Sequence, residues 1–445
     1  MTLPPGPSGP AAVTAARFAR RPLDTLLEWQ RRYGNVFSTH FPVFGTGVYV
    51  AEPAEIRAMF TGDQSEMLAG EANSLLAPVL GENSVLVLDG ARHLRQRKLL
   101  LPPFQGSAVR TFRAIIRDVA ETEIATWTPG AEFAMRERMR ALTFEVICRA
   151  VFGVTEPARV ERLRRALLAV LDLGSSVFLP GVMQRDLGPW SPGGRLKRRL
   201  GVADGLLYEE IELRRREPDL DERTDVLSLL LRARDEDGEP MSDPELRDEL
   251  ITLLAAGHET TATGLAFAFD LLLHNPAVLA RLRNDLEAGS DAYLEAVVTE
   301  TLRLRPVIDA AERTLTKPRM VAGYELPAGI RVYPGIALVH MREDIYPQAK
   351  QFRPERFLDG KAESYSWLPF GGGIRRCIGA ALAQAEMAEV IRIIVERLEL
   401  SAIAPETDPV VLRGITLAPR HGTRIRVERR RVGRPQSAAV PALSS

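Results

Sequence analysis

A long helical pattern in the middle of the chain is the feature that most restricts the possible folds. It begins at Ser242, where Ser-Asp-Pro-Glu matches a capping box with Glu245 three residues on. It ends at His274, which is followed by Asn275 and Pro276, a helix stop signal. A helix of roughly 30 residues is about 45 Å long, enough to cross a whole domain of this size. We therefore expect a fold built around one central helix.

This stretch is apolar enough to be compared with a membrane span. Residues 250–273 are mostly apolar, but His258, Glu259 and Thr260 lie in the middle, where a bilayer would penalise them. The N-terminal region also lacks an apolar run that could serve as a signal sequence or a membrane anchor. We expect a buried helix in a soluble, cytoplasmic protein.

The rest of the chain is predicted to be mainly α-helical with a small β region. Most of the interior shows helical periodicity, whereas short β-like runs occur at residues 47–50, 331–333 and 423–427. With 45% hydrophobic and 26% charged residues, the composition is that of a folded globular protein.

We expect one continuous domain, because no linker, repeat or sharp change of composition interrupts the chain. Residues 1–10 are rich in Pro and Gly and are interpreted as an extended, poorly packed lead-in. The domain is expected to span residues 11–428. Residues 429–445 lose apolar periodicity and are interpreted as a disordered tail.

Charge and cysteine content argue against several classes of partner and site. Lys plus Arg and Asp plus Glu both total 58, so the formal net charge is zero and no global field attracts nucleic acid. The two cysteines, Cys148 and Cys377, are too far apart in sequence to indicate a disulfide framework or a zinc cluster. Cys148 is interpreted as a small core residue. His258 and His340 lack partners at metal-ligand spacing and receive no catalytic role.

The segment from Phe370 to Gly379 carries the strongest chemical signal. Its three consecutive glycines form a tight loop that leads to Cys377. Apolar residues then recur at helical spacing up to Leu398, so Cys377 is expected at the start of a helix. The free N–H groups and the dipole of a helix start stabilise a thiolate. The alternative is a glycine turn with an incidental buried cysteine.

The complete segment resembles the haem-binding signature of the cytochrome P450 superfamily. The five defining positions match at Phe370, Gly373, Arg375, Cys377 and Gly379. The resemblance implies a bacterial-type monooxygenase with the triangular, mainly helical P450 haem domain around a long central helix. It also implies haem b as the cofactor, with Cys377 as the metal ligand that binds the haem iron.

The resemblance suggests roles for the other loop residues. Gly379 would let the helix approach a flat macrocycle. Arg375 would bind a haem propionate through charge-assisted hydrogen bonds. Phe370 would pack near the sulfur and keep it dry.

Upstream of the loop, Glu300 and Arg303 share one face of an apolar helical segment. An isolated pair of this kind is ordinarily a surface ion pair of small energetic value. Together with Arg356, which lies between this pair and the cysteine loop, it resembles the Glu-Arg-Arg triad of P450 enzymes. The resemblance implies a buried, structural network that supports the loop.

In the central helix, residues 256–261 place an acid beside hydroxyl groups in an apolar environment. Hydrogen bonding of Thr260 to the preceding helical turn is one explanation. The segment also looks like the P450 acid-alcohol pair, with Glu259 and Thr260 as the catalytic residues and with Ala256 and Gly257 leaving room above the iron. Thr260 would then orient protons for O2 cleavage, and Glu259 would connect the site to bulk protons through water.

Three further basic residues correspond to P450 residues that bind the haem propionates. His93 and Arg97 are spaced to share a helical face, and Arg313 follows the Glu-x-x-Arg segment. Each would be interpreted in isolation as a solvated basic residue. Their assignment as cofactor-binding residues depends on Cys377.

By analogy with the family, substrate contacts are expected from residues 66–88, from one face of the central helix, and from residues 307–311 and 414–417. The candidate pocket residues are Leu253, Ala256, Val307, Ile308, Asp309 and Ile415. Most of them are apolar, which indicates a small hydrophobic substrate. Asp309 is expected either to bind a hydroxyl or amine of the substrate or to face solvent.

The reaction implied by the resemblance inserts one atom of O2 into a C–H bond, while two electrons and two protons reduce the other atom to water. The segment after Cys377 is too short for a fused reductase, so a separate ferredoxin and ferredoxin reductase are expected to supply electrons. An acidic ferredoxin would dock by local electrostatics near a set of basic residues. These are Arg95, Arg97, Lys98, Arg375 and Arg376.

Two other functions stay open at this point. One is peroxide-driven oxidation or isomerisation on the same haem, and the other is a non-enzymatic haem sensor or carrier. Glu259 and Thr260 argue against both, because neither function needs a relay that delivers protons to oxygen.

Overall fold

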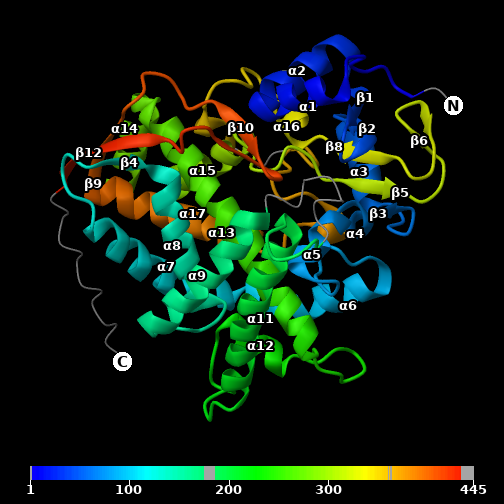
Figure 1. Ribbon diagram of the computed structural model, residues 1–445. Coiled ribbons are helices and arrows are strands. Elements are labelled where there is room, and N and C mark those ends of the chain that lie inside the picture. Colours follow the sequence, from blue (N-terminus) through cyan, green and yellow to red (C-terminus); the bar gives the residue numbers. More distant parts are fainter. Residues whose placement is uncertain (1–2, 175–185, 359, 361–362, 432–445) are drawn as a thin grey trace, which may run out of the picture.

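The computed structural model describes residues 3–174, 186–358, 360 and 363–431 (Figure 1). Helices dominate, and the strands lie along one broad side of the molecule. The outline narrows from that side toward α11 (Pro192–Arg215) and α12 (Val226–Arg232). The prediction of a triangular, mainly helical fold with a small β region is confirmed.

The central helix α13 (Asp243–Leu273) forms as predicted. The Glu245 N–H donates to the Ser242 hydroxyl and the Ser242 N–H donates to the Glu245 carboxylate, which completes the capping box. Most of its residues from Leu246 to Leu272 are buried, because other helices surround it. These helices are α8 (Met135–Ala150), α11, α15 (Ala292–Leu304) and α17 (Ala380–Arg397).

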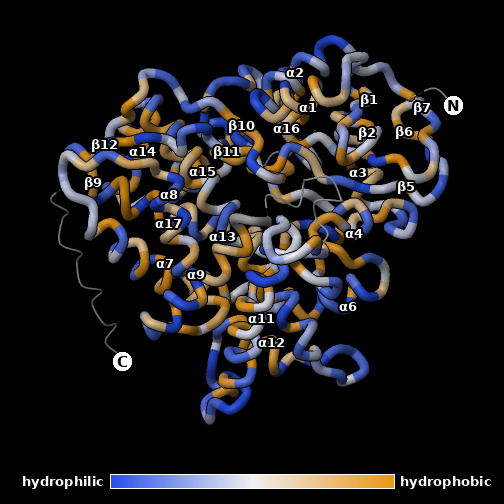
Figure 2. Tube along the Cα trace, in the orientation of Figure 1, coloured by the Kyte–Doolittle hydropathy of each residue, from blue (hydrophilic) through white to orange (hydrophobic). Residues whose placement is uncertain are grey.

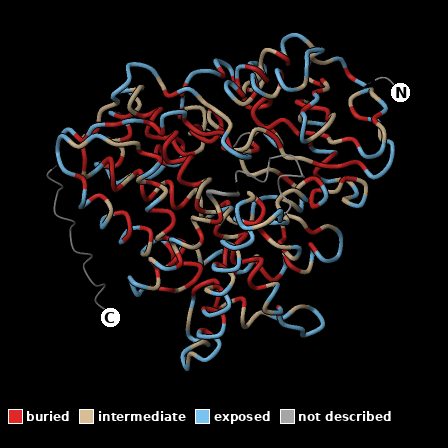
Figure 3. The backbone as a smooth tube through the Cα atoms, viewed as in Figure 1, coloured by how far each residue is buried: buried red, intermediate tan, exposed pale blue. Residues whose placement is uncertain are grey.

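The principal hydrophobic core lies between α13 and its neighbours. Its largest apolar side chains include Phe112, Trp127, Phe144, Phe152 and Phe269. Further helices complete this layer: α7 (Ser107–Ala125), α9 (Pro157–Gly174), α12 and α14 (Pro276–Glu287). Figures 2 and 3 show hydrophobic, buried segments in the interior and hydrophilic, exposed turns at the periphery.

A five-stranded sheet lies beside the N-terminal helices and has the order β1-β2-β8-β5-β3. Its strands are β1 (Val36–Phe41), β2 (Gly45–Val50), β8 (Arg331–Pro334), β5 (Arg313–Leu315) and β3 (Met67–Leu68). A second hydrophobic core fills the space between this sheet and α1 (Ala11–Arg20), α2 (Pro22–Tyr33), α3 (Pro53–Thr61) and α16 (Ile336–His340). Because β5 begins at Arg313, the sheet positions one of the predicted cofactor-binding residues.

The remaining strands form three small sheets. They are β4 (Glu132–Ala134), β12 (Arg424–Arg430) and β9 (Leu398–Ala402), then β10 (Val410–Arg413) with β11 (Thr416–Pro419), and β6 (Arg319–Val321) with β7 (Tyr324–Leu326). The short helices are α4 (Ala69–Ala72), α5 (Ala77–Leu80), α6 (Gly90–Leu100), and the 3-10 turns η1 (Ser74–Leu76), η2 (Pro102–Phe104), η4 (Pro354–Phe357) and η5 (Gly373–Arg375). The predicted β-like runs fall in β2, β8 and β12.

Both ends of the predicted domain are more structured than the sequence indicated. The Ser38 N–H donates to the Pro5 carbonyl at 3.0 Å, so the lead-in packs along β1. The strand β12 continues to Arg430, whose guanidinium donates to the Ile124 carbonyl at 3.0 Å. The boundary expected at residue 428 therefore lies inside a strand. The predicted tail from residue 432 onward is outside the described residues.

The apolar character of α13 does not make it a membrane span by itself. Within the described ranges, no single helix meets the length and hydropathy expected of a membrane-crossing segment. The test is met only when α13 and α14 are taken together, and these two helices are bent by 106° relative to each other.

Candidate functional site

The predicted cysteine loop adopts a tight turn that requires glycine. Gly371 and Gly373 have φ angles of +66° and +61°, in the left-handed region that favours glycine. A Cβ on Gly373 would lie 2.0 Å from the Phe60 carbonyl oxygen. The Cys377 N–H donates to the Phe370 carbonyl at 2.9 Å and closes the loop.

The thiol of Cys377 lies three residues before α17, which begins at Ala380, and not in the first turn of that helix. The side chain has solvent-accessible surface, yet protein surrounds it closely enough for burial to raise the pKa of the thiol. The Gly379 N–H and the charges of Arg376 and Arg97 act in the opposite direction. The expected thiolate stabilisation by the helix start is therefore outweighed by burial. A bound metal cation would reverse this balance, because it deprotonates a coordinating thiol.

Four basic side chains from separate parts of the sequence lie close together. His93 and Arg97 belong to α6, Arg313 to β5, and Arg375 to η5. Burial, and then the charges of Arg375, Arg97 and Arg313, lower the pKa of His93 to about 3. Burial also lowers the pKa of Arg313 to about 10, and the nearby Arg375 adds to this effect. The structure thus brings all four predicted propionate-binding residues together.

This cluster has more positive than negative charge. Asp89 pairs with Arg375 at 2.5 Å, an acidic partner that the sequence analysis did not identify. Among the described residues, the buried Nε of Arg313 has no hydrogen-bond partner. Unsatisfied buried donors are costly, so the cluster is suited to binding carboxylates.

Small residues leave part of α13 uncovered. Ala256 is exposed although Leu254 and His258, within two residues of it, are buried. A Cβ on Gly257 would lie 3.1 Å from the side chain of Ile147 on α8, so the two helices approach closely there.

The acid and the alcohol of α13 have different partners. The Thr260 hydroxyl donates to the Ala256 carbonyl at 2.5 Å, which is the helical back-bonding that the sequence left open. The Glu259 carboxylate forms ion pairs with Arg136 and, at 2.9 Å, with Arg140. Both arginines belong to α8, and the sequence analysis did not identify them. They fix the Glu259 side chain against α8.

The Glu-Arg-Arg network forms in the interior. The Arg303 guanidinium donates to both oxygens of Glu300, at 2.6 and 2.8 Å, and both side chains are fully buried. The Arg356 Nε donates to Glu300 at 3.1 Å, and its side chain is 11% exposed. The Arg353 backbone N–H adds a fourth bond to the same carboxylate, at 2.9 Å. One carboxylate therefore holds two guanidiniums and the segment that contains η4.

His340 connects this network to the cysteine loop. Its Nδ1 donates to the Arg303 carbonyl at 3.1 Å, and its Nε2 accepts the Leu368 N–H at 2.8 Å. Burial lowers the pKa of His340 to about 3, so the ring is neutral and can make both bonds. The indole of Trp367 also donates to the Thr299 carbonyl of α15 at 3.1 Å. No local pattern indicated this role of His340, because its partners are backbone atoms of distant residues.

The predicted pocket residues come from three separate parts of the chain. Leu253 and Ala256 lie on α13, Val307 and Ile308 follow α15, and Ile415 lies at the turn between β10 and β11 with 47% exposure. The Leu417 N–H donates to the Val307 carbonyl at 2.8 Å, which attaches this hairpin to the segment after α15.

The Asp309 side chain points to the sheet. Its carboxylate accepts a hydrogen bond from the Tyr49 hydroxyl of β2 at 2.9 Å. Burial raises the pKa of Asp309 to about 6, and the Tyr49 bond acts against that shift. Asp309 therefore has a protein partner that neither of the two sequence-based interpretations included.

The predicted docking residues are not equally available. Arg95 pairs with Asp235 and Glu245, and the Arg375 side chain is 11% exposed beside Asp89. Acidic side chains of this chain therefore already pair with both of these arginines. Arg97 is half-buried and donates to the Arg376 carbonyl at 2.6 Å. The side chains of Lys98 and Arg376 are exposed.

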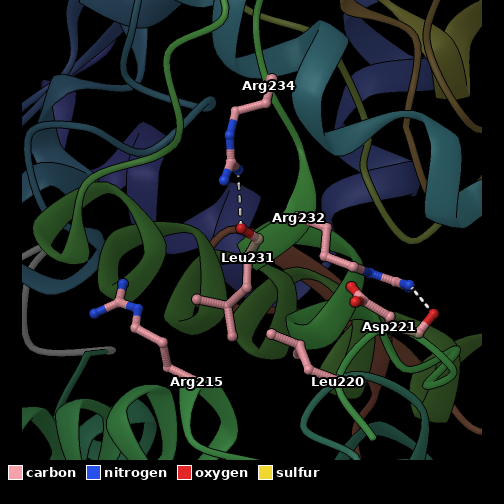
Figure 4. Close-up of a pocket in the computed structure, with 6 residues that line it drawn as sticks. All are labelled: Arg215, Leu220, Asp221, Leu231, Arg232 and Arg234. Atoms are coloured by element: carbon pink, nitrogen blue, oxygen red, sulfur yellow. Dashed lines mark hydrogen bonds between the residues drawn. The ribbon is translucent and has the colours of Figure 1, made fainter. Parts of the chain in front are cut away.

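A surface hollow of about 520 Å³ lies at α11 and α12 (Figure 4). It is lined by Arg215, Leu220, Asp221, Leu231, Arg232 and Arg234. Arg232 donates to the Asp221 carbonyl, and Arg234 donates to the Leu231 carbonyl at 3.0 Å. None of the predicted site residues lines this hollow, and we assign no ligand to it.

Comparison with known proteins identifies the family. The cytochrome P450 family model matches residues 4–423. The chain belongs to the cytochrome P450 family.

Relatives and solved structures agree with this assignment. Putative cytochrome P450 135B1 of Mycobacterium tuberculosis is 44% identical, and the match covers 96% of this chain and 92% of that protein. Putative cytochrome P450 135A1 of the same species is 39% identical, with 97% and 96% covered. The solved structure of retinoic acid-bound cyanobacterial CYP120A1 has a TM-score of 0.83 and 25% identity, and the match covers 96% of this chain and 99% of that chain. The protein is thus a P450 monooxygenase that uses a haem, O2 and a redox partner.

The observed residues fit a haem. The thiol of Cys377 is a suitable iron ligand. The basic cluster has more positive than negative charge and contains an orphaned donor on Arg313, as expected for a site that binds two propionates. Cys148, by contrast, is fully buried in the principal core, and burial raises its thiol pKa.

We expect Arg303→Ala to reduce the haem content of the purified P450 sharply. The change leaves the Glu300 carboxylate with one guanidinium in a fully buried position, at a cost of about 3–5 kcal/mol. Arg356→Ala should have a smaller effect, because Arg303 keeps both of its bonds to Glu300. The ratio of Soret to protein absorbance and the urea midpoint measure these effects.

Arg353→Ala is the matched control for this series. Its exposed guanidinium donates to Gln348, whereas its backbone bond to Glu300 is unaffected by the change. This variant should keep its haem and its stability. Full haem content in Arg303→Ala would contradict the structural role of the network.

Proposed function

We propose that this P450 binds haem b through Cys377 and inserts one atom of O2 into a C–H bond of a small hydrophobic substrate. The observation that carries the proposal is the accessible thiol of Cys377 in a glycine loop, together with a cluster of four buried or half-buried basic residues. When bound, the haem supplies O2 activation, and two electrons and two protons reduce the second oxygen atom to water.

The basic cluster would hold the haem through its propionates. His93, Arg97, Arg313 and Arg375 come from three elements, so binding would join α6, β5 and η5. The neutral His93 would donate a hydrogen bond, and the arginines would add charge. Phe370, which is 5.9 Å from Trp367 between ring centroids, would shield the sulfur, and Gly379 would allow a close approach.

Glu259 and Thr260 would deliver protons. The Thr260 hydroxyl donates its proton to the Ala256 carbonyl, so its oxygen lone pairs can still accept a hydrogen bond from a proton donor. Glu259 is paired with Arg136 and Arg140, so its carboxylate would have to leave an arginine to exchange a proton. The two arginines would thereby control how often Glu259 connects the site to bulk water.

The substrate would lie against Leu253, Ala256, Val307, Ile308 and Ile415. These residues are apolar, and Ala256 and Ile415 are exposed. The related CYP120A1 was solved with retinoic acid bound, and a hydrophobic ligand of that kind is compatible with such a lining. Because Asp309 is bonded to Tyr49, it would act on the substrate indirectly, by holding the segment after α15.

Electrons would come from a separate ferredoxin and its reductase. The exposed Arg376 is next to Cys377, and the exposed Lys98 lies on α6 close to Arg97. Asp235 and Glu236 partly neutralise Arg95 and Lys98, so Arg376 would be the main attraction for an acidic partner. Peroxide-driven oxidation or isomerisation on the same haem is the competing reaction.

We expect Cys377→Ser to abolish the long-wavelength Soret band of the reduced carbonyl adduct, because this band depends on thiolate ligation. Absorbance spectra of freshly reduced, carbon monoxide-treated protein measure it. Cys148→Ser is the control and should keep the band. A wild-type protein that is colourless, or that lacks this band, would refute the proposal.

We expect Thr260→Ala to uncouple electron use from product formation, because protons would be poorly oriented for O2 cleavage. The ratio of product to NADPH consumed should fall about ten-fold or more. Thr263→Val, on the same helix, should keep wild-type coupling. Unchanged coupling in Thr260→Ala, or turnover driven by peroxide alone, would favour the competing reaction.

We expect Arg376→Glu to raise the KM for ferredoxin about ten-fold at low ionic strength, and the difference should shrink as salt is added. Lys98→Glu should have a weaker effect because Glu236 already pairs with Lys98. Arg195→Glu, an exposed change on α11, is the control. A KM insensitive to both salt and Arg376→Glu would rule out this docking surface.

A further inference from the structure

Residues 81–89, here named the strap, lie along one face of α13. The Asn83 backbone N–H and side-chain amide both donate to the Asp248 carboxylate, at 2.9 and 3.0 Å. The Val85 N–H donates to Glu249 Oε1 at 2.8 Å. The contacted residues of α13 belong to adjacent turns of one helix. The strap is therefore bound through its backbone as well as its side chains.

A third contact and a close approach strengthen this attachment. The Thr252 hydroxyl lies 2.7 Å from the Ser84 hydroxyl, and both residues are buried. Gly81, at the start of the strap, has a φ of +92°, and a Cβ there would lie 2.1 Å from the Asp248 carboxyl carbon. Only glycine fits this position.

The other side of the strap holds Arg375. The Arg375 guanidinium donates to the Val85 carbonyl at 3.1 Å and to the Leu88 carbonyl, and it pairs with Asp89. Val85 thus links the two sides, because its N–H is bound to Glu249 and its carbonyl is bound to Arg375.

We propose that Asp248, Glu249 and Thr252 are positioning residues that fix the strap against α13 and, through the strap, set the orientation of Arg375. The inference rests on the proposed role of Arg375 in binding a haem propionate. It assigns the first part of α13 a task distinct from that of Glu259 and Thr260.

Glu249 performs this task as a neutral acid. Burial raises its pKa well above the usual range, and the charges of Asp248 and Glu245 raise it further, while the Val85 N–H has a smaller opposite effect. Its second oxygen is buried and has no partner among the described residues. A charged carboxylate would be costly there. The contact with Val85 therefore requires an oxygen acceptor and no charge.

Amide hydrogen exchange in the haem-loaded, full-length protein tests the attachment. Glu249→Leu removes the acceptor and leaves the Val85 N–H buried, so exchange across residues 81–89 should rise about ten-fold or more. Glu249→Gln keeps a neutral oxygen acceptor, so the amides of residues 81–89 should exchange at the wild-type rate. Thr252→Val is a milder change and should accelerate hydrogen exchange in residues 81–89 to a smaller extent.

Glu386→Leu is the matched control, because it removes another buried carboxyl, on α17. It should leave exchange in the strap unchanged. Unchanged exchange in both Glu249→Leu and Thr252→Val would overturn the attachment. If Glu249→Gln and Glu249→Leu accelerated hydrogen exchange in the strap equally, the conclusion that Glu249 acts as a neutral acid would be wrong.

The reduction potential of the haem tests the link to Arg375. Arg375→Gln should lower the potential, because a positive charge beside the propionates is lost. Glu249→Leu should lower it less, and Glu249→Gln should not change it. A wild-type potential in Glu249→Leu, with a lowered one in Arg375→Gln, would overturn the link. If Arg375→Gln leaves the reduction potential unchanged, Arg375 does not bind a propionate, and the proposed link between the strap and the haem fails as well. The hydrogen-exchange data would still decide whether Glu249 and Thr252 attach the strap to α13.

Discussion

The structure around the cysteine loop of this P450 depends on the buried carboxylate of Glu300. It is fully buried, and it accepts bonds from Arg303, Arg356 and the Arg353 backbone. A buried charge of this kind is tolerated only when its partners are in place. Through His340, the same network bonds the backbone at Leu368, two residues before the cysteine loop begins at Phe370. The position of Cys377 is therefore set by a chain of buried polar contacts that starts on α15.

A second constraint is the shortage of negative charge around His93, Arg97, Arg313 and Arg375. Desolvated arginines that repel one another are unfavourable in a protein interior, and here their charges also keep His93 neutral. Here Asp89 offsets only part of that repulsion. A fold that maintains such a cluster is suited to an anionic ligand, and the two carboxylates of a haem match the need. Cofactor binding and the stability of this region are therefore expected to be coupled.

The central helix α13 carries different contacts along its length. Its first part binds the strap, its middle exposes Ala256 beside Glu259 and Thr260, and its last part carries Asp270, which accepts the Asp408 backbone N–H. The last contact ties the helix to the start of the hairpin that bears Ile415. A single helix thus contacts the strap that holds Arg375, carries Glu259 and Thr260, and is tied to the hairpin of the proposed substrate site.

The sequence alone determined features that depend on neighbouring residues. The limits of α13, the helix that carries Glu300 and Arg303, and the glycine loop before Cys377 all follow from capping, periodicity and backbone freedom within a few positions. Only the tertiary structure decided which distant groups meet. Asp89 beside Arg375, Arg136 and Arg140 on Glu259, and Tyr49 on Asp309 leave no local pattern in the chain. These partners are selected by burial, since a charge removed from water must find a counter-charge or a hydrogen bond wherever the fold brings one within reach.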